Sequence, residues 1–222
     1  MESRGEKKIV LKHLGIKDFN EVWDFQKKIF NALLQAKLNG ESNLQNFLIT
    51  CQHPHVITLG KSGNENNIEI AEFPGVKYVR IDRGGDITYH GPGQLVVYPI
   101  LDLEKFNLSL RNYIYILEQA VIETLTEFSI DSGRIKEYTG VWVDYETKHP
   151  RKIAAIGVKT SRHITMHGLA FNINPDLNYF NLIIPCGIRD KEVTSLEKEL
   201  EKNIDFELVS QLFVTKFRNL LK

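Results

Sequence analysis

RGGDITYHGPGQL, residues 83–95, places four glycines and one proline within thirteen residues. Glycine permits positive φ angles and lets another strand or a ligand approach the backbone closely, and proline stiffens a turn. A glycine pair most often marks a tight hairpin turn. Here the glycines are interleaved with polar and aromatic side chains: Arg83, Thr88, Tyr89, His90 and Gln94. This density favours the wall of a pocket over a simple turn.

Short β-branched runs surround this stretch and predict strands. They are NFLITC (46–51), VITL (56–59), VKYVRI (76–81), QLVVYPI (94–100), GVWVDY (140–145), KIAAIGVK (152–159) and ITMHGLAFNI (164–173). Apolar residues at helical spacing predict helices over residues 20–38, 109–128 and 205–221, with Ser109 as an N-cap. This order is not the strict alternation of a doubly wound fold. We therefore expect an α+β fold in which a mixed, mostly antiparallel sheet is flanked by helices.

Length and composition indicate one domain over residues 1–222, with the motifs in a core of about residues 46–200. The chain is 42% hydrophobic, and its 28 basic residues equal its 28 acidic ones. That balance gives no global reason to expect nucleic acid or a membrane surface as a partner. No signal-peptide core and no membrane-length apolar run occur, so we expect a cytoplasmic protein.

Two cysteines occur, Cys51 and Cys186, and they form no CxxC pair. A disulfide framework or a cysteine zinc site is therefore not indicated. His53 and His55, in HPH, lack a third ligand nearby, so no metal is expected. We assign Cys51 to packing.

Cys186 lies in IIPCGI and has two interpretations. A lone cysteine after an apolar run is commonly a small buried hydrophobe. A Pro-Cys-Gly turn can instead hold a thiol at a strand end, where a nucleophile would be accessible. Because a free thiol is only a few per cent ionised at neutral pH, a nucleophile needs a nearby cation or base. The candidates are Lys152, Lys159, Arg162, His163, His167 and His90. Taken alone, a lysine at the start of an apolar strand, such as Lys152, is usually a solvated edge residue.

RGGDITYHGPGQLVVYPI, then KIAAIGVK, HGLAFNI, and IIPCGI with VTSL closely resemble the lipoyl(octanoyl) transferases over about residues 53–196. The resemblance implies the catalytic-domain fold shared with biotin and lipoate protein ligases. It also implies transfer of an octanoyl group from acyl-carrier protein to a lysine of a lipoyl domain, through a thioester on a cysteine. This reaction is the first step of endogenous protein lipoylation.

The resemblance assigns catalytic roles to Cys186, as the acylated nucleophile, and to Lys152, as the residue that lowers the pKa of the thiol. A protonated Lys152 would favour the thiolate, and a neutral Lys152 could instead act as a base when the acceptor amine attacks. It implies an acyl pocket lined by Arg83, Gly84, Gly85, Asp86, Ile87, Thr88, Tyr89, His90, Ala155, Ile156, Gly157, Gly168, Leu169 and Ala170. We expect the glycines to wrap the acyl chain and His90, with backbone N–H groups, to polarise the reacting carbonyl. Gly85→Val is then expected to abolish transfer without unfolding the protein.

The implied partners are acyl-carrier protein, lipoyl domains of 2-oxoacid dehydrogenase E2 subunits and the glycine cleavage H protein. No cofactor is implied, because the octanoyl group arrives on the phosphopantetheine of the carrier, and we expect a monomer. Three alternatives remain: an ATP-dependent lipoate or biotin protein ligase, a thiol acyl hydrolase with His167 or His90 as base, and a non-catalytic carrier-binding module. The PCG and TYHGPGQ segments favour the transferase.

Overall fold

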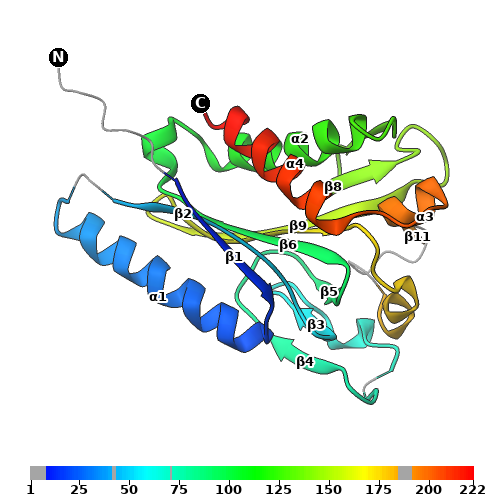
Figure 1. Cartoon of the computed structure of the whole chain (residues 1–222). Coiled ribbons are helices and arrows are strands. Elements are labelled where there is room, and N and C mark those ends of the chain that lie inside the picture. Colours follow the sequence, from blue (N-terminus) through cyan, green and yellow to red (C-terminus); the bar gives the residue numbers. More distant parts are fainter. Residues whose placement is uncertain (1–8, 42–43, 71, 185–191) are drawn as a thin grey trace.

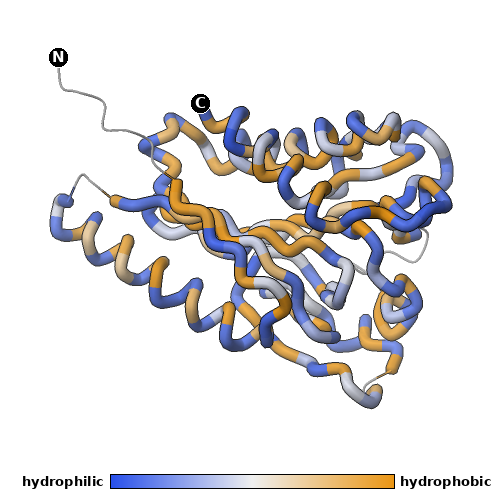
Figure 2. The backbone as a smooth tube through the Cα atoms, viewed as in Figure 1, coloured by the Kyte–Doolittle hydropathy of each residue, from blue (hydrophilic) through white to orange (hydrophobic). Residues whose placement is uncertain are grey.

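The computed structural model describes residues 9–41, 44–70, 72–184 and 192–222. A large sheet lies in the middle of the molecule, with α1 (Phe19–Leu38) and a small sheet on one side and α2 (Leu110–Thr126) and α4 (Phe206–Leu220) on the other (Figure 1). Apolar residues gather along the central strands and hydrophilic residues on the outer faces of the helices (Figure 2). This layering buries both faces of the sheet.

The large sheet has the strand order β1-β2-β6-β10-β9-β8-β7, with β11 paired to β9. Only β1–β2 and β11–β9 are parallel, and every other pair is antiparallel. Its strands are β1 (Ile9–Ile16), β2 (Asn46–Gln52), β6 (Gln94–Ile100), β7 (Ser132–Ile135), β8 (Tyr138–Val143), β9 (Arg151–Ser161), β10 (Ile164–Asn172) and β11 (Glu192–Val193). The expected mixed, mostly antiparallel sheet flanked by helices is confirmed.

A second sheet of three strands has the order β4-β3-β5. Its strands are β3 (Val56–Leu59), β4 (Lys77–Arg80) and β5 (Ile87–His90). From its sequence, the whole glycine-rich stretch is predicted to lie between strands. β5, however, consists of the residues ITYH of this stretch. The stretch therefore contains a strand as well as a turn, and the turn is confined to the residues just before β6.

The three predicted helices are confirmed to within about two residues, because both their caps and their buried faces are encoded locally. Ser109 accepts the N–H of Asn112 at 3.1 Å and begins α2 as predicted. Asp205 accepts the N–H groups of Glu207 and Leu208 and begins α4. Such caps satisfy N–H groups that have no partner within the helix.

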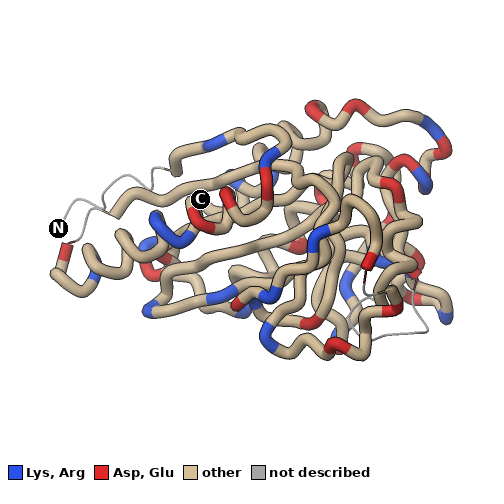
Figure 3. The backbone as a smooth tube through the Cα atoms, turned by 90° about the horizontal axis from the view of Figure 1, so that it is seen from below, with Lys and Arg blue, Asp and Glu red and all other residues tan. Residues whose placement is uncertain are grey.

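Several short elements were not predicted: β1, β7, β11, α3 (Leu196–Leu200) and three 3-10 turns, η1 (Glu65–Asn67), η2 (Leu103–Phe106) and η3 (Leu177–Leu182). Most are too brief to show a periodicity, and β1 is an edge strand with no fully buried residue. No helix in the described ranges is long and apolar enough to cross a bilayer. Basic and acidic residues are interspersed over the chain (Figure 3).

The larger of the two main cores lies between the sheet and the α2–α4 pair. Leu117 of α2 is fully buried there, whereas Arg111 on the same helix is exposed. We expect Leu117→Ala to lower the free energy of unfolding by about 2–5 kcal/mol through lost burial and a cavity. Arg111→Ala should change it by less than about 0.5 kcal/mol. Denaturant unfolding of both variants measures the difference, and equal effects would contradict this account of the core.

Candidate functional site

A trough runs along the face of the large sheet that carries α1 and the small sheet. In the register of β9 and β10, Ala155 pairs with Ala170 and Gly157 pairs with Gly168. These four small residues, which alternate with larger ones along two central strands, leave room that larger side chains would fill. The space above them forms a hollow of about 580 Å³, part of it open to solvent. The small residues of the KIAAIGVK and HGLA segments therefore form the floor of this hollow.

The opposite wall comes from β5 and the loop before it, with Phe19 of α1 and Val96 and Tyr98 of β6 closing the side. The predicted catalytic residue Lys152 lines this hollow, as do most of the predicted pocket residues: Arg83, Gly85, Asp86, Ile87, Thr88, His90, Ala155, Ile156, Gly157, Gly168, Leu169 and Ala170. Phe19, Ile81, Val96, Tyr98, Thr139 and His167 line it as well and were not among the predicted pocket residues.

Two predicted residues, Gly84 and Tyr89, do not line the hollow. The N–H of Gly84 donates to the carbonyl of Val158 at 3.0 Å and so ties the loop to β9. Tyr89 is fully buried, stacks on Tyr179 with ring centres 5.2 Å apart, and bonds His55 Nδ1 through its hydroxyl at 2.8 Å. Side chains alternate along β5, so Tyr89 faces away from the trough while its neighbours Thr88 and His90 reach it.

Lys152 stands at one end of the trough. It is half-buried, and its Nζ lies 4.6 Å from the ring centre of Trp142 on the neighbouring strand. Such a cation–π contact orients an ammonium group. Because β9 lies between β10 and β8, Lys152 is not on an edge strand, and the interpretation as a solvated edge residue is wrong.

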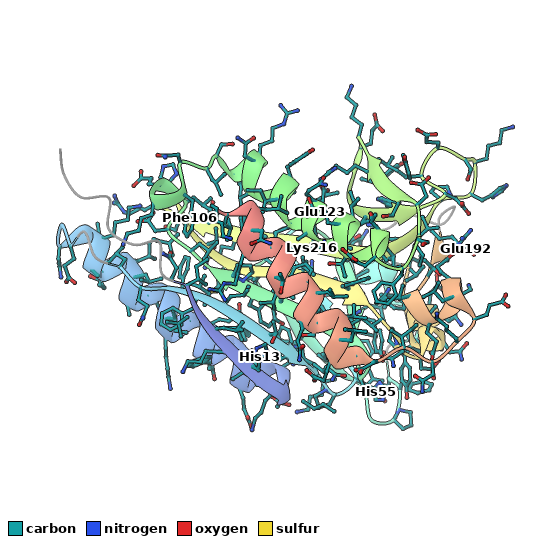
Figure 4. All side chains as sticks on the ribbon, turned by 45° about the horizontal axis from the view of Figure 1, so that its top comes forward. His13, His55, Phe106, Glu123, Glu192 and Lys216 are labelled. Atoms are coloured by element: carbon teal, nitrogen blue, oxygen red, sulfur yellow. The ribbon has the colours of Figure 1, made fainter. Side chains whose placement is uncertain are left out.

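Cys186 lies outside the described residues, within the segment 185–191. The chain on both sides of that segment adjoins residues that line the hollow. The N–H of Ile184 donates to the carbonyl of Asn67, whose side chain donates to Asp86 at 2.5 Å. On the other side, Val193 of β11 pairs with Lys152 (Figure 4 labels the preceding Glu192).

Apart from His90 on β5, the other basic candidates lie toward the far end of β9, in its turn into β10 or on β10 itself. Lys159 is seven residues along β9 from Lys152, which corresponds to about 23 Å of extended strand. Its Nζ pairs with Asp82 at 2.5 Å, and His163 pairs with Glu104 at 3.4 Å. Among the described candidate cations, Lys152 is the one at the end of the trough where the chain re-emerges from the segment that holds Cys186.

A buried relay of hydrogen bonds fixes the orientation of His90. The amide of Asn172 donates to the carbonyl of Thr194 at 3.0 Å, so its oxygen accepts from Gln94 Nε2 at 2.8 Å. The remaining oxygen of Gln94 then accepts from His90 Nδ1 at 2.7 Å. Nδ1 of His90 is therefore the protonated nitrogen, and Nε2 is an acceptor that lies 3.4 Å from the hydroxyl of Thr58.

Burial lowers the pKa of His90 to about 3, with the nearby His53 as a further cause. At neutral pH the ring is therefore neutral, and it donates its single N–H to the side-chain oxygen of Gln94. The expectation that His90 donates a hydrogen bond to the reacting carbonyl is not supported by this network. Its low pKa also makes it a poor general base for the hydrolase alternative.

The guanidinium of Arg83 donates to three acceptors. Its Nη2 donates to the carbonyl of Thr58 at 2.9 Å and to the hydroxyl of Thr58 at 3.0 Å, and its Nη1 donates to the carbonyl of Gly84 at 3.1 Å. Gly85, next in the loop, has φ +87°, a backbone conformation that side chains rarely adopt. Gly85→Val would therefore strain the loop itself, and the expected loss of transfer without loss of stability does not follow.

Asp82 and His167 form a second polar group at the trough, and Asp82 was not predicted. Nε2 of His167 donates to Asp82 at 2.8 Å, and its backbone N–H donates to Gln26 at 3.1 Å. The hydrogen bond from His167 and the ion pair with Lys159 hold the pKa of Asp82 well below its usual range. Burial, the largest cause, lowers the pKa of His167.

Cys51 and His53 have structural roles that their surroundings explain. Cys51 is buried in the core under α1, as predicted, and that burial raises the pKa of its thiol. His53 uses both ring nitrogens, bonding the carbonyl of Lys17 at 2.8 Å and the hydroxyl of Tyr98 at 2.9 Å. The described part of the chain holds no cluster of three or more side chains suited to a metal ion.

The sequence matches the model of the family described as "Lipoyl protein ligase A/B catalytic domain" over residues 18–218. It is 52% identical over 197 residues to an octanoyltransferase of Bacteroides fragilis strain YCH46, covering 87% of this chain and 89% of that protein. It is 46% identical over 226 residues to an octanoyltransferase of Christiangramia forsetii, covering 97% of each.

Among solved structures, the fold is similar to a bipartite lipoate protein ligase from Thermoplasma acidophilum, studied with its E2 lipoyl domain. The TM-score is 0.68 at 14% identity, over 96% of this chain and 84% of that one. This likeness confirms the expected ligase-type fold.

The buried neutral His90 predicts a pH dependence of stability. Because its folded-state pKa of about 3 is below the unfolded value near 6.5, its contribution is complete above about pH 6.5 and is lost as the pH falls toward 3. Between pH 7 and pH 4.5, the unfolding free energy of the wild type should fall by about 2–3 kcal/mol more than that of His90→Gln. Denaturant unfolding across that range measures it. His149→Gln, at an exposed histidine, is the matched control and should leave the decline unchanged; equal pH dependence in all three proteins would contradict the assignment.

Proposed function

Since the chain belongs to the lipoyl protein ligase A/B catalytic domain family and is an acyltransferase of the octanoyltransferase type, we propose that it acylates a lysine of lipoyl domains through a thioester on Cys186. The donor in this proposal is octanoyl-acyl-carrier protein. The observation that carries it is the trough of paired alanines and glycines, which offers an extended apolar chain a narrow groove with Lys152 at one end. Apolar side chains of Phe19, Ile81 and Val96 add to its lining.

Cys186 serves as the nucleophile in the first step. Its sulfur forms a bond to the thioester carbonyl carbon while the bond from that carbon to the pantetheine sulfur breaks. The pantetheine leaves as a thiolate and takes up the proton released by Cys186. A thioester has a good leaving group, so the step needs an activated thiolate more than a strong acid. A protonated Lys152 beside the thiol favours that thiolate electrostatically.

The second step transfers the octanoyl group from Cys186 to the amine of the acceptor lysine. The neutral amine of the acceptor lysine forms a bond to the carbonyl carbon, the bond to the Cys186 sulfur breaks, and the departing thiolate is again stabilised by the Lys152 ammonium. The proton lost from the new amide nitrogen passes to solvent or to the Cys186 thiolate. Acceptor lysines on lipoyl domains are supported by the lipoate ligase of similar fold, which was studied with its E2 lipoyl domain.

The histidines of the trough have positioning roles in this proposal. His90 keeps Thr58 and Arg83 in place, and His167 pairs in register with Val158, six residues along β9 from Lys152. The hydrolase alternative requires a histidine that activates water, and burial lowers the pKa of both His90 and His167. We propose further that the chain acts as a monomer in the cytoplasm, with no bound cofactor.

The test is intact-protein mass spectrometry after incubation with octanoyl-acyl-carrier protein, followed by addition of a lipoyl domain. We expect one octanoyl increment that hydroxylamine removes, that is absent from Cys186→Ser, and that moves to the lipoyl-domain lysine. Lys152→Ala should slow formation of the adduct by about 10²–10⁴-fold. Lys148→Ala, at an exposed lysine of the β8–β9 connection, is the control and should retain the wild-type rate.

Full acylation of Cys186→Ser would exclude the cysteine route. Lipoyl-domain modification that needs ATP and a free acid would instead identify a ligase. Release of free octanoate as the sole product would identify a hydrolase.

A further inference from the structure

The direction in which Lys152 points depends on an irregularity in the pairing of β9 with β8. Val141 pairs with Ala154, but the next residue of β8, Trp142, pairs with Lys152. Ile153 is therefore an extra residue in β9, which makes the irregularity a β-bulge. Bulges are common beside active sites, where they change the direction of a side chain.

The bulge decides which face of the sheet carries the lysine. Ile153 and Ala154 are both fully buried in the core under α2 and α4, although consecutive residues of a regular strand face opposite sides. Lys152 and Ala155, on either side of them, both line the trough. With regular alternation, Ala155 in the trough would place Ile153 there and turn Lys152 toward the core. The bulged register therefore brings the ammonium group into the trough.

Gly140 and Trp142 of β8 form the surface on which the Lys152 side chain lies. A Cβ atom at Gly140 would come 3.5 Å from Cε of Lys152, and Nζ of the lysine lies 4.6 Å from the ring centre of Trp142. The same Cβ would lie 2.5 Å from the carbonyl oxygen of Ala154, closer than real Cβ atoms come. Gly140 also has φ +131°, a conformation that favours glycine. The lysine therefore packs against bare backbone at this position.

A buried carboxylate of α2 holds this glycine in place. Oε1 of Glu118 accepts the backbone N–H of Gly140 at 3.0 Å, and Oε2 accepts from Nε of Arg134, on β7, at 2.8 Å. The guanidinium also donates to the carbonyl of Tyr115 and to the side chain of Gln119, at 3.0 Å each. Glu118 is 7% exposed, so its charge has left water and both of its oxygens are engaged. Hydrogen bonds to a charged acceptor of this kind are stronger than those between neutral groups.

Glu118 can affect the reaction through the strand that it holds. It is not one of the described residues that line the trough. Without its carboxylate, Gly140 would keep a buried N–H that has no acceptor, which is unfavourable. β8 would then relax from its present conformation, and the surface beneath Lys152 would move with it.

We propose that Glu118 is a positioning residue for Lys152: it fixes Gly140 in a conformation that leaves room for the lysine side chain beside the bulge. The proposal rests on the proposed octanoyl transfer, in which Lys152 favours the thiolate of Cys186. It assigns a part in that transfer to a side chain of α2, a helix on the opposite side of the sheet from the trough (Figure 1).

The first measurement is the pH dependence of Cys186 alkylation by iodoacetamide, followed by mass spectrometry of the modified peptide. A protonated lysine lowers the pKa of a neighbouring thiol, and an unperturbed thiol has a pKa of about 8.5. We expect Lys152→Ala to raise the apparent pKa of Cys186 toward that value, and Glu118→Ala to raise it at least half as far. Cys51 is buried and gives no background in the folded protein.

Further variants separate positioning from a general loss of stability. Glu118→Ala should slow acylation by octanoyl-acyl-carrier protein by about 10–100-fold. Glu118→Gln keeps an oxygen that accepts from Gly140, and should retain the wild-type rate and the wild-type pKa of the thiol. In protein that carries both Glu118→Ala and Lys152→Ala, acylation should be no slower than in Lys152→Ala alone, because Glu118 acts through the lysine. Glu123→Ala, at a half-buried carboxylate of the same helix (Figure 4), is the control and should match the wild type in both measurements.

A wild-type pKa of Cys186 in Glu118→Ala, or additive losses of rate in the double variant, would overturn the positioning role and leave the proposed function intact. If Glu118→Ala does not fold, Glu118→Leu, which fills a similar volume without an acceptor, decides in its place. No acylation of wild-type Cys186, or a pKa that Lys152→Ala does not change, would instead contradict the proposed function.

Discussion

Between β9 and β10 the central sheet pairs alanine with alanine and glycine with glycine, and the architecture of the site depends on this one constraint. Sheet interiors normally carry large β-branched side chains, because cross-strand pairs of such residues stabilise the sheet. Here that stabilisation is given up on one face only. The opposite face retains Ile153, Leu169 and Phe171 in the core under α2 and α4, which lets the sheet hold together while its other face stays hollow.

The second constraint is the direction of the buried polar relay. Once the amide of Asn172 donates to Thr194, the orientations of Gln94, His90 and Thr58 follow in turn, and the last member accepts from Arg83. Networks of this kind specify one arrangement when every member is satisfied. The relay joins the segment just after residues 185–191 to the glycine-rich loop, so both walls of the trough are held in one register.

Features that depend on neighbours in sequence could be predicted, and those that depend on distant neighbours could not. The helices α1, α2 and α4 follow from periodicity and caps such as Ser109. The strand β5 is hidden by the glycines around it, since four residues give no clear period. Most of the pocket lining followed from family resemblance.

Phe19, Tyr98 and Thr139 belong to the site only because folding brings them there. Likewise, the tautomer of His90 is set through Asn172, which is 78 residues from the Gln94 that it bonds. No local pattern encodes that partnership, and sequence reasoning therefore gave His90 a donor role that its surroundings oppose. The position of Cys186 remains a prediction, since it lies outside the described residues.

The most direct test of the central claim is the acyl-chain dependence of transfer by Ala155→Leu, which fills the middle of the trough and leaves Lys152 in place. Acetyl- and octanoyl-acyl-carrier protein would be compared as donors, with melting temperature as the check on folding. If the trough holds the acyl chain, octanoyl transfer should fall about 100-fold or more while acetyl transfer stays near its wild-type rate. Equal transfer of octanoyl groups by the variant and the wild type would show that the acyl chain binds elsewhere.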